Sequence, residues 1–398
     1  MSLLTRLLFA SLLLAGLTGC VNQTVKSTSV PPLERPDTTV AEAELLDVAI
    51  AVFDPGLDNY EEDQQIYPEV RKAEARFMPR LLAETLQNTG AWGAVRVVPN
   101  DHQISDLMVE GTILHSDGEN LQLHIQARDA RGSLWLDREY SAHASRYAYT
   151  PTSRGNYDAF QAIYHRIAND LLRELKTLDS ADRRDLRRVT EMRFAQEFAP
   201  EAFDAYLRED RKGRLQVVRL PAEDDPMLER IRRIRERDHL FVDTLQEHYG
   251  QFSGDMYAPY QEWRKMSYEE AIALQELRAQ SRRQLIAGGA AVLAGIIAAG
   301  SDNRSVRTAG SVGIIGGGYL LKGGLETRNE AQMHVQALEE LGMSLEAEIT
   351  PRVIELEDRT VMLSGNVEEQ YEQWRELLSD IYRAEMGMLD DPTAATGP

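Results

Sequence analysis

The chain has 398 residues, a formal net charge of −20 and a single cysteine, and 43% of its residues are hydrophobic. This length is enough for about two or three domains, and the hydrophobic fraction excludes a chain that is disordered throughout. One cysteine excludes an intramolecular disulfide. The excess of acidic residues argues against a general nucleic-acid-binding protein.

The first residues have the pattern of a secretory signal. Arg6 supplies a positive charge, and the apolar run from Leu7 to Ala15 is too short to cross a bilayer core of about 30 Å. The run leads into Leu17-Thr18-Gly19-Cys20, which resembles the lipobox of bacterial lipoproteins. This resemblance implies that residues 1–19 are removed and that Cys20 carries a diacylglycerol and an N-acyl chain. The alternative is an ordinary cleaved signal with an incidental cysteine.

The residues after Cys20 predict the membrane and the tether. Val21, rather than Asp, follows the cysteine, and in similar Gram-negative lipoproteins this implies the outer membrane, facing the periplasm. A Gram-positive surface lipoprotein is the alternative. Because each buried CH₂ group contributes about 0.8 kcal/mol, two or three acyl chains form a stable anchor. Residues 20–45 are polar and contain Pro31, Pro32 and Pro36, which predicts a flexible lipidated tether.

Residues 46–180 are predicted to form an α+β domain. Alternating apolar residues and turn signals predict strands at 46–53, 94–98, 107–114, 121–127 and 133–140. Helical spacing predicts one helix at 68–88 and another, capped by Asn156, with an apolar stripe from Phe160 to Leu175. The resulting order is β-α-β-β-β-β-α.

This order resembles a known group of periplasmic domains. The residues that carry the likeness are "VAIAVF", "LAETLQNTGAWGAVRVV", "SDLMVEGTIL" and "LQLHIQARDARGSLW". The group comprises the curli secretion channel family, the TolB N-terminal domain and the lipoprotein activators of penicillin-binding proteins. The resemblance implies a fold and a compartment, but no particular activity, because one fold hosts unrelated functions.

Residues 181–283 are predicted to be helical and highly charged. Asp225-Pro226 favours a helix start, and five arginines follow it: Arg230, Arg232, Arg233, Arg235 and Arg237. We expect intrahelical ion pairs for them, with contact to anionic lipid or a partner as the alternative. Tyr257, Tyr260, Trp263 and Tyr268 form an aromatic cluster before the next predicted helix, and core packing is favoured over an interfacial belt.

Residues 284–324 contain two uncharged, glycine-rich runs joined by a polar loop. Small residues recur every four positions at Ala287, Ala291, Gly295, Ala299 and at Ala309, Gly313, Gly317. On helices, each set forms a ridge that permits close backbone packing. The pattern resembles glycine-zipper segments of bacterial envelope proteins. It predicts a helical hairpin that self-associates or inserts into a membrane, with packing against its own domain or a loop-rich spacer as alternatives.

Residues 325–390 are predicted to form a small α-β-β-α domain, followed by a loose tail at 391–398. Strands are expected at 353–356 and 360–365, and Asn366 with Glu369 has the spacing of a capping box. The segment "RTVMLSGNVEEQYEQW" weakly resembles the BON domain, a periplasmic module associated with envelope surfaces. Because this region is acidic, protein or peptidoglycan contact is expected rather than contact with anionic lipid.

No enzyme motif was found. The chain has no P-loop, no suitable GxGxxG and no HExxH, and Ala309 to Gly313 only approximates a nucleophile elbow. His115 and His124 can face each other across a predicted hairpin, but two histidines are weak evidence for a metal site. The sequence therefore predicts no catalytic residues, no metal and no cofactor besides the lipids on Cys20.

Together these features predict a non-enzymatic envelope lipoprotein, a scaffold or assembly subunit of an envelope complex. Its expected partners are the bilayer, other envelope proteins or peptidoglycan, and further copies of itself, but not nucleic acid. The alternative is a membrane-inserting or pore-forming protein that uses the same hairpin. A peptidoglycan hydrolase is a remote third possibility.

Overall fold

In a computed structural model of the chain, the structure describes residues 30–58, 67–149, 158–222, 224–298, 340, 352–355 and 360–386. The fold is α+β, as predicted, and its main feature is a five-stranded mixed sheet followed in the chain by helices. The predicted signal segment and Cys20 lie outside the described residues.

The sheet confirms the predicted order of elements. It comprises β1 (Val48–Ala51), β2 (Val95–Val98), β3 (Leu107–Ser116), β4 (Asn120–Asp129) and β5 (Leu134–His143), arranged β2-β1-β3-β4-β5. β1 is parallel to both its neighbours, and β3, β4 and β5 form the two predicted hairpins.

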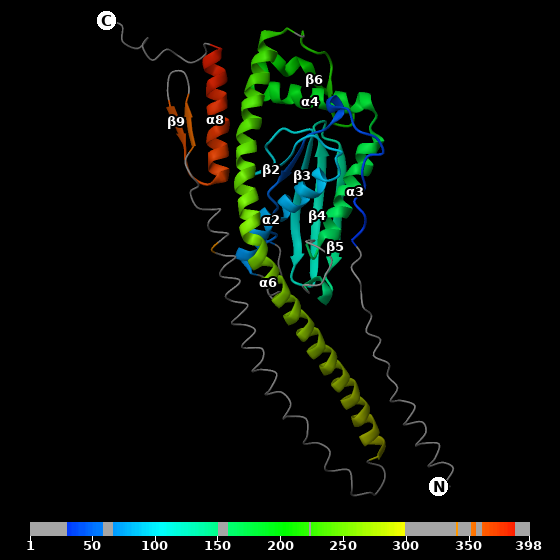
Figure 1. Cartoon of the computed structure of the whole chain (residues 1–398). Coiled ribbons are helices and arrows are strands. Elements are labelled where there is room, and N and C mark those ends of the chain that lie inside the picture. The colour runs from blue at the N-terminus through cyan, green and yellow to red at the C-terminus, as the bar shows by residue number, and fades with distance from the viewer. Residues whose placement is uncertain are drawn as a thin grey trace.

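Two helices cover one face of the sheet. Helix α2 (Pro68–Gln87) connects β1 to β2 and is one continuous helix despite Pro79. Helix α3 (Gln161–Thr177) packs against α2 and β5 (Figure 1). The predicted cap of α3 at Asn156 is wrong, because the helix begins later. Phe160 holds the cap position, and the Asp158 carboxylate accepts a hydrogen bond from the Phe160 N–H.

The other elements of this part of the chain are short, apart from α4. The 3₁₀ helices are η1 (Glu42–Glu44), η2 (Arg146–Tyr149) and η3 (Asp204–Tyr206). Helix α4 (Ser180–Phe198) is capped by Asp179, and α5 (Pro200–Phe203) follows it. A small hairpin of β6 (Leu207–Glu209) and β7 (Leu215–Val217) comes next.

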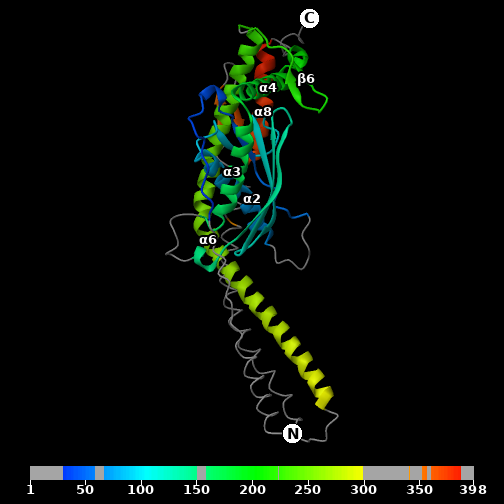
Figure 2. The ribbon, with the colours of Figure 1, turned by 90° about the vertical axis from the view of Figure 1, so that its right-hand side faces the viewer.

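Helix α6 (Pro226–Ala298) is a single helix of 73 residues that begins at the predicted place. Its first part packs against α2, β2 and α4, whereas its last part projects beyond the other described elements (Figures 1 and 2). Pro259 lies inside it and removes one backbone donor, which supplies a cause for the change of direction seen in both views. The helix continues through the predicted boundary at residue 284.

The predicted aromatic cluster lies within α6, not before it. Tyr260 and Trp263 are buried against α2, and this confirms core packing for these two. Tyr257 is exposed.

The C-terminal elements return to α6. Strands β8 (Arg352–Glu355) and β9 (Thr360–Leu363) form the predicted hairpin, and α8 (Val367–Glu385) packs along the first part of α6 (Figure 1). Asn366 and Glu369 form the predicted capping box. The first predicted helix of this region lies outside the described residues, apart from Glu340, which is helical.

The prediction that residues 20–45 form a flexible tether is wrong for residues 30–45. The carbonyl oxygens of Pro31 and Pro32 lie 2.8 and 3.0 Å from His165 Nδ1 and Asn169 Nδ2 on α3. Farther along, Glu44 pairs with Arg184 of α4 at 2.8 Å. Side chains of two helices therefore fix this segment to the domain, and only residues 20–29 of the predicted tether fall outside the described chain.

Candidate interaction site at the base of helix α6

The predicted helix-packing ridge lies partly on the projecting end of α6. Ala287, Ala291 and Gly295 belong to α6, where residues four apart lie on the same side of a helix. Ala299, Ala309, Gly313 and Gly317 lie outside the described residues, so the packing of the two ridges against each other stays a prediction. The candidate site is the base of α6, from Tyr260 to Tyr268. There the projecting end of the helix leaves the body, which is the sheet with the helices that pack around it.

A buried ion pair fixes the base of α6. Arg264 Nη1 lies 2.6 Å from Asp158 Oδ2, and their side chains are 0% and 2% exposed. The guanidinium also lies 4.0 Å from the ring centroid of Tyr260 and 4.8 Å from that of Phe160. Such a pair is tolerated in the folded protein only when both charges are present, because one buried charge without its partner destabilises the fold. It therefore ties α6 to the residues that lead into α3.

A second buried carboxylate connects three elements at the same level. Glu74 of α2 accepts hydrogen bonds of 2.5 Å from the Tyr260 hydroxyl on α6 and from the Ser116 hydroxyl at the end of β3. Burial raises the Tyr260 pKa well above its ordinary value, so the phenol keeps its proton and remains a donor. The phenol and the carboxylate thus hold α6 against α2.

The β3–β4 turn touches the backbone of α6 directly. The Gly118 N–H donates to Ser267 Oγ at 3.1 Å, and the Tyr149 hydroxyl donates to the Gly118 carbonyl at 2.5 Å. A Cβ atom at Gly118 would clash with the Arg264 carbonyl oxygen and the Tyr268 nitrogen. Only glycine fits this close approach, so the turn acts as a second point of attachment for α6.

Higher on the body, α6 covers the edge of the sheet. The Gln246 amide accepts from the Val97 N–H at 2.9 Å and donates to the Val97 carbonyl at 2.8 Å. Beside it, Arg96 pairs with Asp243 at 2.6 Å. Because these bonds satisfy backbone groups of the edge strand β2, the first part of α6 protects that edge from pairing with another chain.

The five arginines of α6 make contacts different from those predicted. Arg230, Arg233 and Arg237 all lie within 4 Å of Glu385 on α8, and Arg232 pairs with Glu191 of α4 at 2.7 Å. These ion pairs join separate helices, so the prediction of intrahelical pairs is wrong for these four. Their partners lie in the same chain, on helices that pack beside α6.

Two neighbouring residues on this part of α6 have strongly shifted pKa values. Burial raises the pKa of Asp238 to about 6, against the opposing effect of Arg375. Burial, together with the charges of Arg235 and Arg96, lowers the pKa of His239 to about 4. At neutral pH the histidine is therefore uncharged, which suits its position between two arginines.

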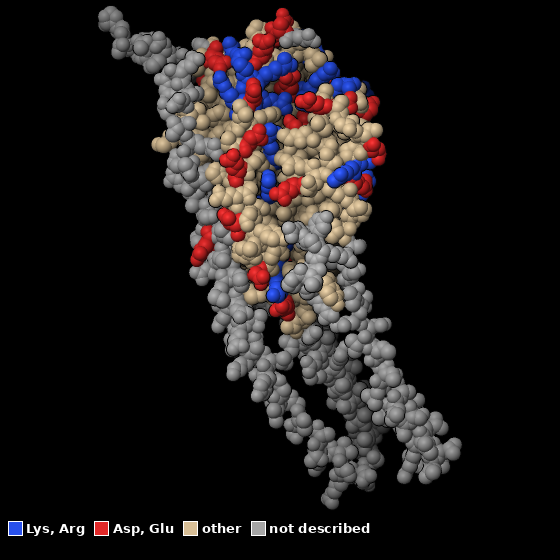
Figure 3. Space-filling view, viewed as in Figure 1, with Lys and Arg blue, Asp and Glu red and all other residues tan. Residues whose placement is uncertain are grey.

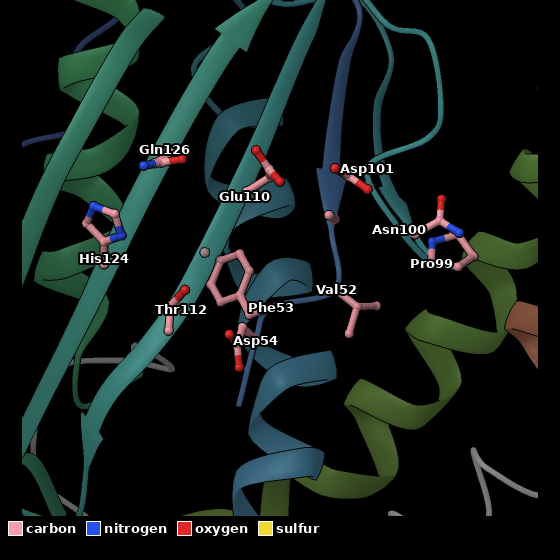
Figure 4. A pocket seen from close by; sticks show the side chains of 12 residues that line it. Val52, Phe53, Asp54, Pro99, Asn100, Asp101, Glu110, Thr112, His124 and Gln126 are labelled. Carbon is pink, nitrogen blue, oxygen red and sulfur yellow. The ribbon is translucent and has the colours of Figure 1, made fainter. Parts of the chain in front are cut away.

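A separate pocket of about 490 Å³ lies on the sheet. Figure 4 shows Glu110 and Thr112 on β3, and His124 and Gln126 on β4, facing it from one side. Its other side is formed by residues after β1 and β2, among them Asp54, Asn100 and Asp101. One Asp54 oxygen accepts from the Gly56 N–H at 2.8 Å. The lining is polar and carries carboxylates, but it has no nucleophile with a base beside it.

The two histidines singled out in the sequence do not meet. His124 lies opposite Thr112, and His115 lies opposite Gln122. Each has its own carboxylate partner: Asp117 lies 2.8 Å from His115, and Asp137 lies 2.7 Å from His124. Within the part of the chain that the structure describes, no group of three or more metal-ligating side chains comes together.

Sequence reasoning missed the residues that form the base of α6. Arg264 and Glu74 look like ordinary surface charges in a charged helical pattern. A usable signal exists for Arg264, because it follows Met256, Tyr260 and Trp263 on the apolar stripe. Asp158 precedes α3 by three residues and reads locally as a turn residue.

No model of a known protein family matches the chain, and no curated protein is significantly similar to it. Among the described residues, no helix is both long enough and apolar enough to span a bilayer.

Proposed function

We propose that this chain is a non-enzymatic, lipid-anchored envelope protein that acts as a scaffold or assembly subunit and self-associates through the end of α6. The observation that carries the proposal is the division of α6. Its first part is fixed to the body by buried charges. Its last part projects beyond the other described elements (Figure 1) and contains Ala287, Ala291 and Gly295 of the predicted ridge. A helix whose first part is fixed to the body and whose end projects beyond the other described elements is suited to contact a partner.

The lipid anchor is the second part of the proposal. Its support is the lipobox-like sequence Leu17-Thr18-Gly19-Cys20 and the absence of any other cysteine in the chain. An outer-membrane location facing the periplasm follows from Val21 only by resemblance. Metabolic labelling with a fatty acid tests the anchor, since the Cys20→Ser variant should lose the label and leave the membrane fraction.

Crosslinking tests self-association. Gly295→Leu places bulk on the ridge, and we expect it to abolish crosslinked oligomers of the full-length protein, alone or together with Gly313→Leu. Gly289→Leu is the matched control. Gly289 is two residues from both Ala287 and Ala291, which is about 200° around the helix. The same change is therefore made on the side of the helix opposite the ridge. Oligomers that survive Gly295→Leu, or that are lost equally in Gly289→Leu, would contradict the proposal.

The second candidate is a membrane-perturbing protein that uses the same segment. It is favoured by the uncharged run from Leu285 to Gly300. Dye release from vesicles separates the two functions, because a scaffold should associate without causing leakage.

A further inference from the structure

We infer that the projecting end of α6 contacts the same bilayer that holds the acyl chains of Cys20. The inference rests on the proposed lipid anchor and adds to it an orientation of the whole molecule and a surface that meets lipid. It follows from where the chain enters the body, where α6 leaves it, and how much chain connects the anchor to the body.

The entry and exit points lie at the same end of the body. The chain first contacts the body through Pro31, whose carbonyl oxygen lies 2.8 Å from His165 on α3. His165 lies in the second turn of α3, about 6 Å along the helix from Gln161 at a rise of about 1.5 Å per residue, and Asp158 lies three residues before that helix begins. Asp158 in turn pairs with Arg264 at the base of α6. The views in Figures 1 and 2 agree that α6 projects beyond this end.

The connection from Cys20 to Pro31 is short. At about 3.6 Å per residue it reaches about 40 Å when fully extended. As a flexible chain its average span is about 20 Å. The body is longer than this. From Arg264 to Pro226 the first part of α6 measures about 57 Å. Residues 158–165 span at most about 16 Å, so the far end of the body lies at least about 40 Å beyond the entry point.

These lengths decide which end faces the membrane. If the far end lay against the bilayer, the connection would have to be stretched to its full extension of about 40 Å, twice its average span as a flexible chain. The end with the base of α6 therefore faces or flanks the bilayer. From Tyr268 to Ala298 the projecting part of α6 is about 45 Å long. This is longer than the average span of the tether, so when this end faces the bilayer, the tip of α6 is long enough to reach the lipid surface.

The distribution of charge agrees with this orientation. Charged side chains of both signs gather at the far end of the body, around α4 and the start of α6 (Figure 3). The run from Leu285 to Gly300 near the opposite tip carries no charge. Arg282 and Arg283 precede that run, and arginine is a residue type that is favoured at membrane interfaces.

Fluorescence quenching in vesicles tests the inference. Because acylation blocks Cys20, an introduced cysteine is the only free thiol of the lipidated protein and can carry an environment-sensitive fluorophore. Val292→Cys places it on the projecting part of α6. Leu240→Cys is the matched control, since Leu240 is 60% exposed on the part of the same helix that packs on the body. The vesicles contain phosphatidylethanolamine, phosphatidylglycerol and a nitroxide-labelled phospholipid.

We expect the lipid nitroxide to reduce the emission at position 292 by roughly twofold or more, as for a group at the acyl–headgroup boundary, with no change at position 240. Equal, unquenched emission at both positions would overturn the inference. A blue shift at position 292 without quenching would also overturn it, because a second copy rather than lipid would then cover the helix. Mass spectrometry of the peptide that begins at Cys20 is run on the same sample. A missing acyl group would refute the proposed anchor itself, whereas an acylated protein with an unquenched probe refutes only the orientation.

Discussion

Arg264 and Asp158 are oppositely charged side chains that both lie within the protein interior. Removing one charge leaves the other buried without a partner, which costs about 3–5 kcal/mol. Asp158→Asn keeps an oxygen for the hydrogen bond from the Phe160 N–H. Its NH₂ group replaces the oxygen that accepts from Arg264 and Gln261, so the change removes the ion pair and its acceptor together. We expect a loss of stability in that range, measured by urea unfolding of the protein lacking its lipid.

The control for this variant is an exposed ion pair in the same molecule. Asp185 pairs with Arg188 at 2.9 Å, and its side chain is 65% exposed. Exposed pairs contribute only about 0–1 kcal/mol, so Asp185→Asn should change stability little. Equal effects of the two substitutions would mean that the Arg264 pair does not hold α6 to the body.

The shifted pKa values of Asp238 and His239 predict that the two residues change the folding stability in opposite directions as the pH changes. The folded-state pKa of Asp238 is raised to about 6, so its contribution is present below about pH 4 and is lost as pH rises through 6. The folded-state pKa of His239 is lowered to about 4. Its contribution is therefore present above about pH 6.5 and is lost as pH falls through 4.

Substituting His239 separates these two effects. Between pH 6.5 and 4, His239 should cost the wild type up to about 3 kcal/mol of folding stability, at 1.36 kcal/mol per pKa unit. His239→Gln should not show this loss. The variant should therefore gain stability relative to the wild type as the pH falls. Asp238→Asn should do the opposite and steepen the fall. Urea midpoints at four pH values check both, and parallel profiles for all three proteins would contradict the assignment.

At the scale of the elements, attachment of the β3–β4 turn to α6 depends on one glycine. Gly118→Ala would force the turn and the helix apart, and overpacking of this kind costs about 1–3 kcal/mol. Gly254 lies on α6 with open space around it, so Gly254→Ala should be neutral or stabilise by up to about 1 kcal/mol. Thermal unfolding distinguishes the two. A Gly118→Ala protein as stable as the wild type would show that the turn is free to move.

The continuity of α6 illustrates what local sequence could not predict. Gly250, Gly254 and Pro259 all disfavour a helix interior, so the pattern favoured an interruption and a second helix. The helix persists because Phe252, Met256 and Tyr260 are buried against α2. That stabilisation comes from residues almost two hundred positions earlier in the chain, and no local pattern contains it.

The sheet and the N-terminal segment show the same contrast. Strands β3, β4 and β5 were predictable because one face is buried and the other is not, which produces alternation in the sequence. The contacts of Pro31 and Pro32 were not predictable, since their carbonyl oxygens meet side chains of α3. For the same reason the ridge could be recognised from its spacing, whereas the base of α6 could not.

At the scale of the whole molecule, the chain leaves the body after Tyr268 and returns with the C-terminal elements. The return is tightly packed: Trp374 of α8 stacks on Phe241 of α6, with ring centroids 4.7 Å apart. Arg375 contacts both Asp238 and Glu197. Among the described residues, the buried core is built entirely from the segments before Tyr268 and from Leu363 onward. Among the described residues, the projecting part of α6 therefore follows one of two parts of the chain that are fixed to each other.

This arrangement predicts that residues 272–350 can be removed without unfolding the body. Residues 272–350 replaced by a flexible Gly/Ser linker of about 20 residues, with a root-mean-square span of about 25 Å, should leave a folded protein. We expect its unfolding midpoint to lie within a few degrees of that of the full-length protein, because no buried contact among the described residues is lost. Self-association and lipid quenching should disappear. Calorimetry and sedimentation of the same sample measure both properties. Loss of the folded body would show that this segment contributes to the core, whereas oligomers of the shortened protein would place the self-association surface on the body instead of on the end of α6.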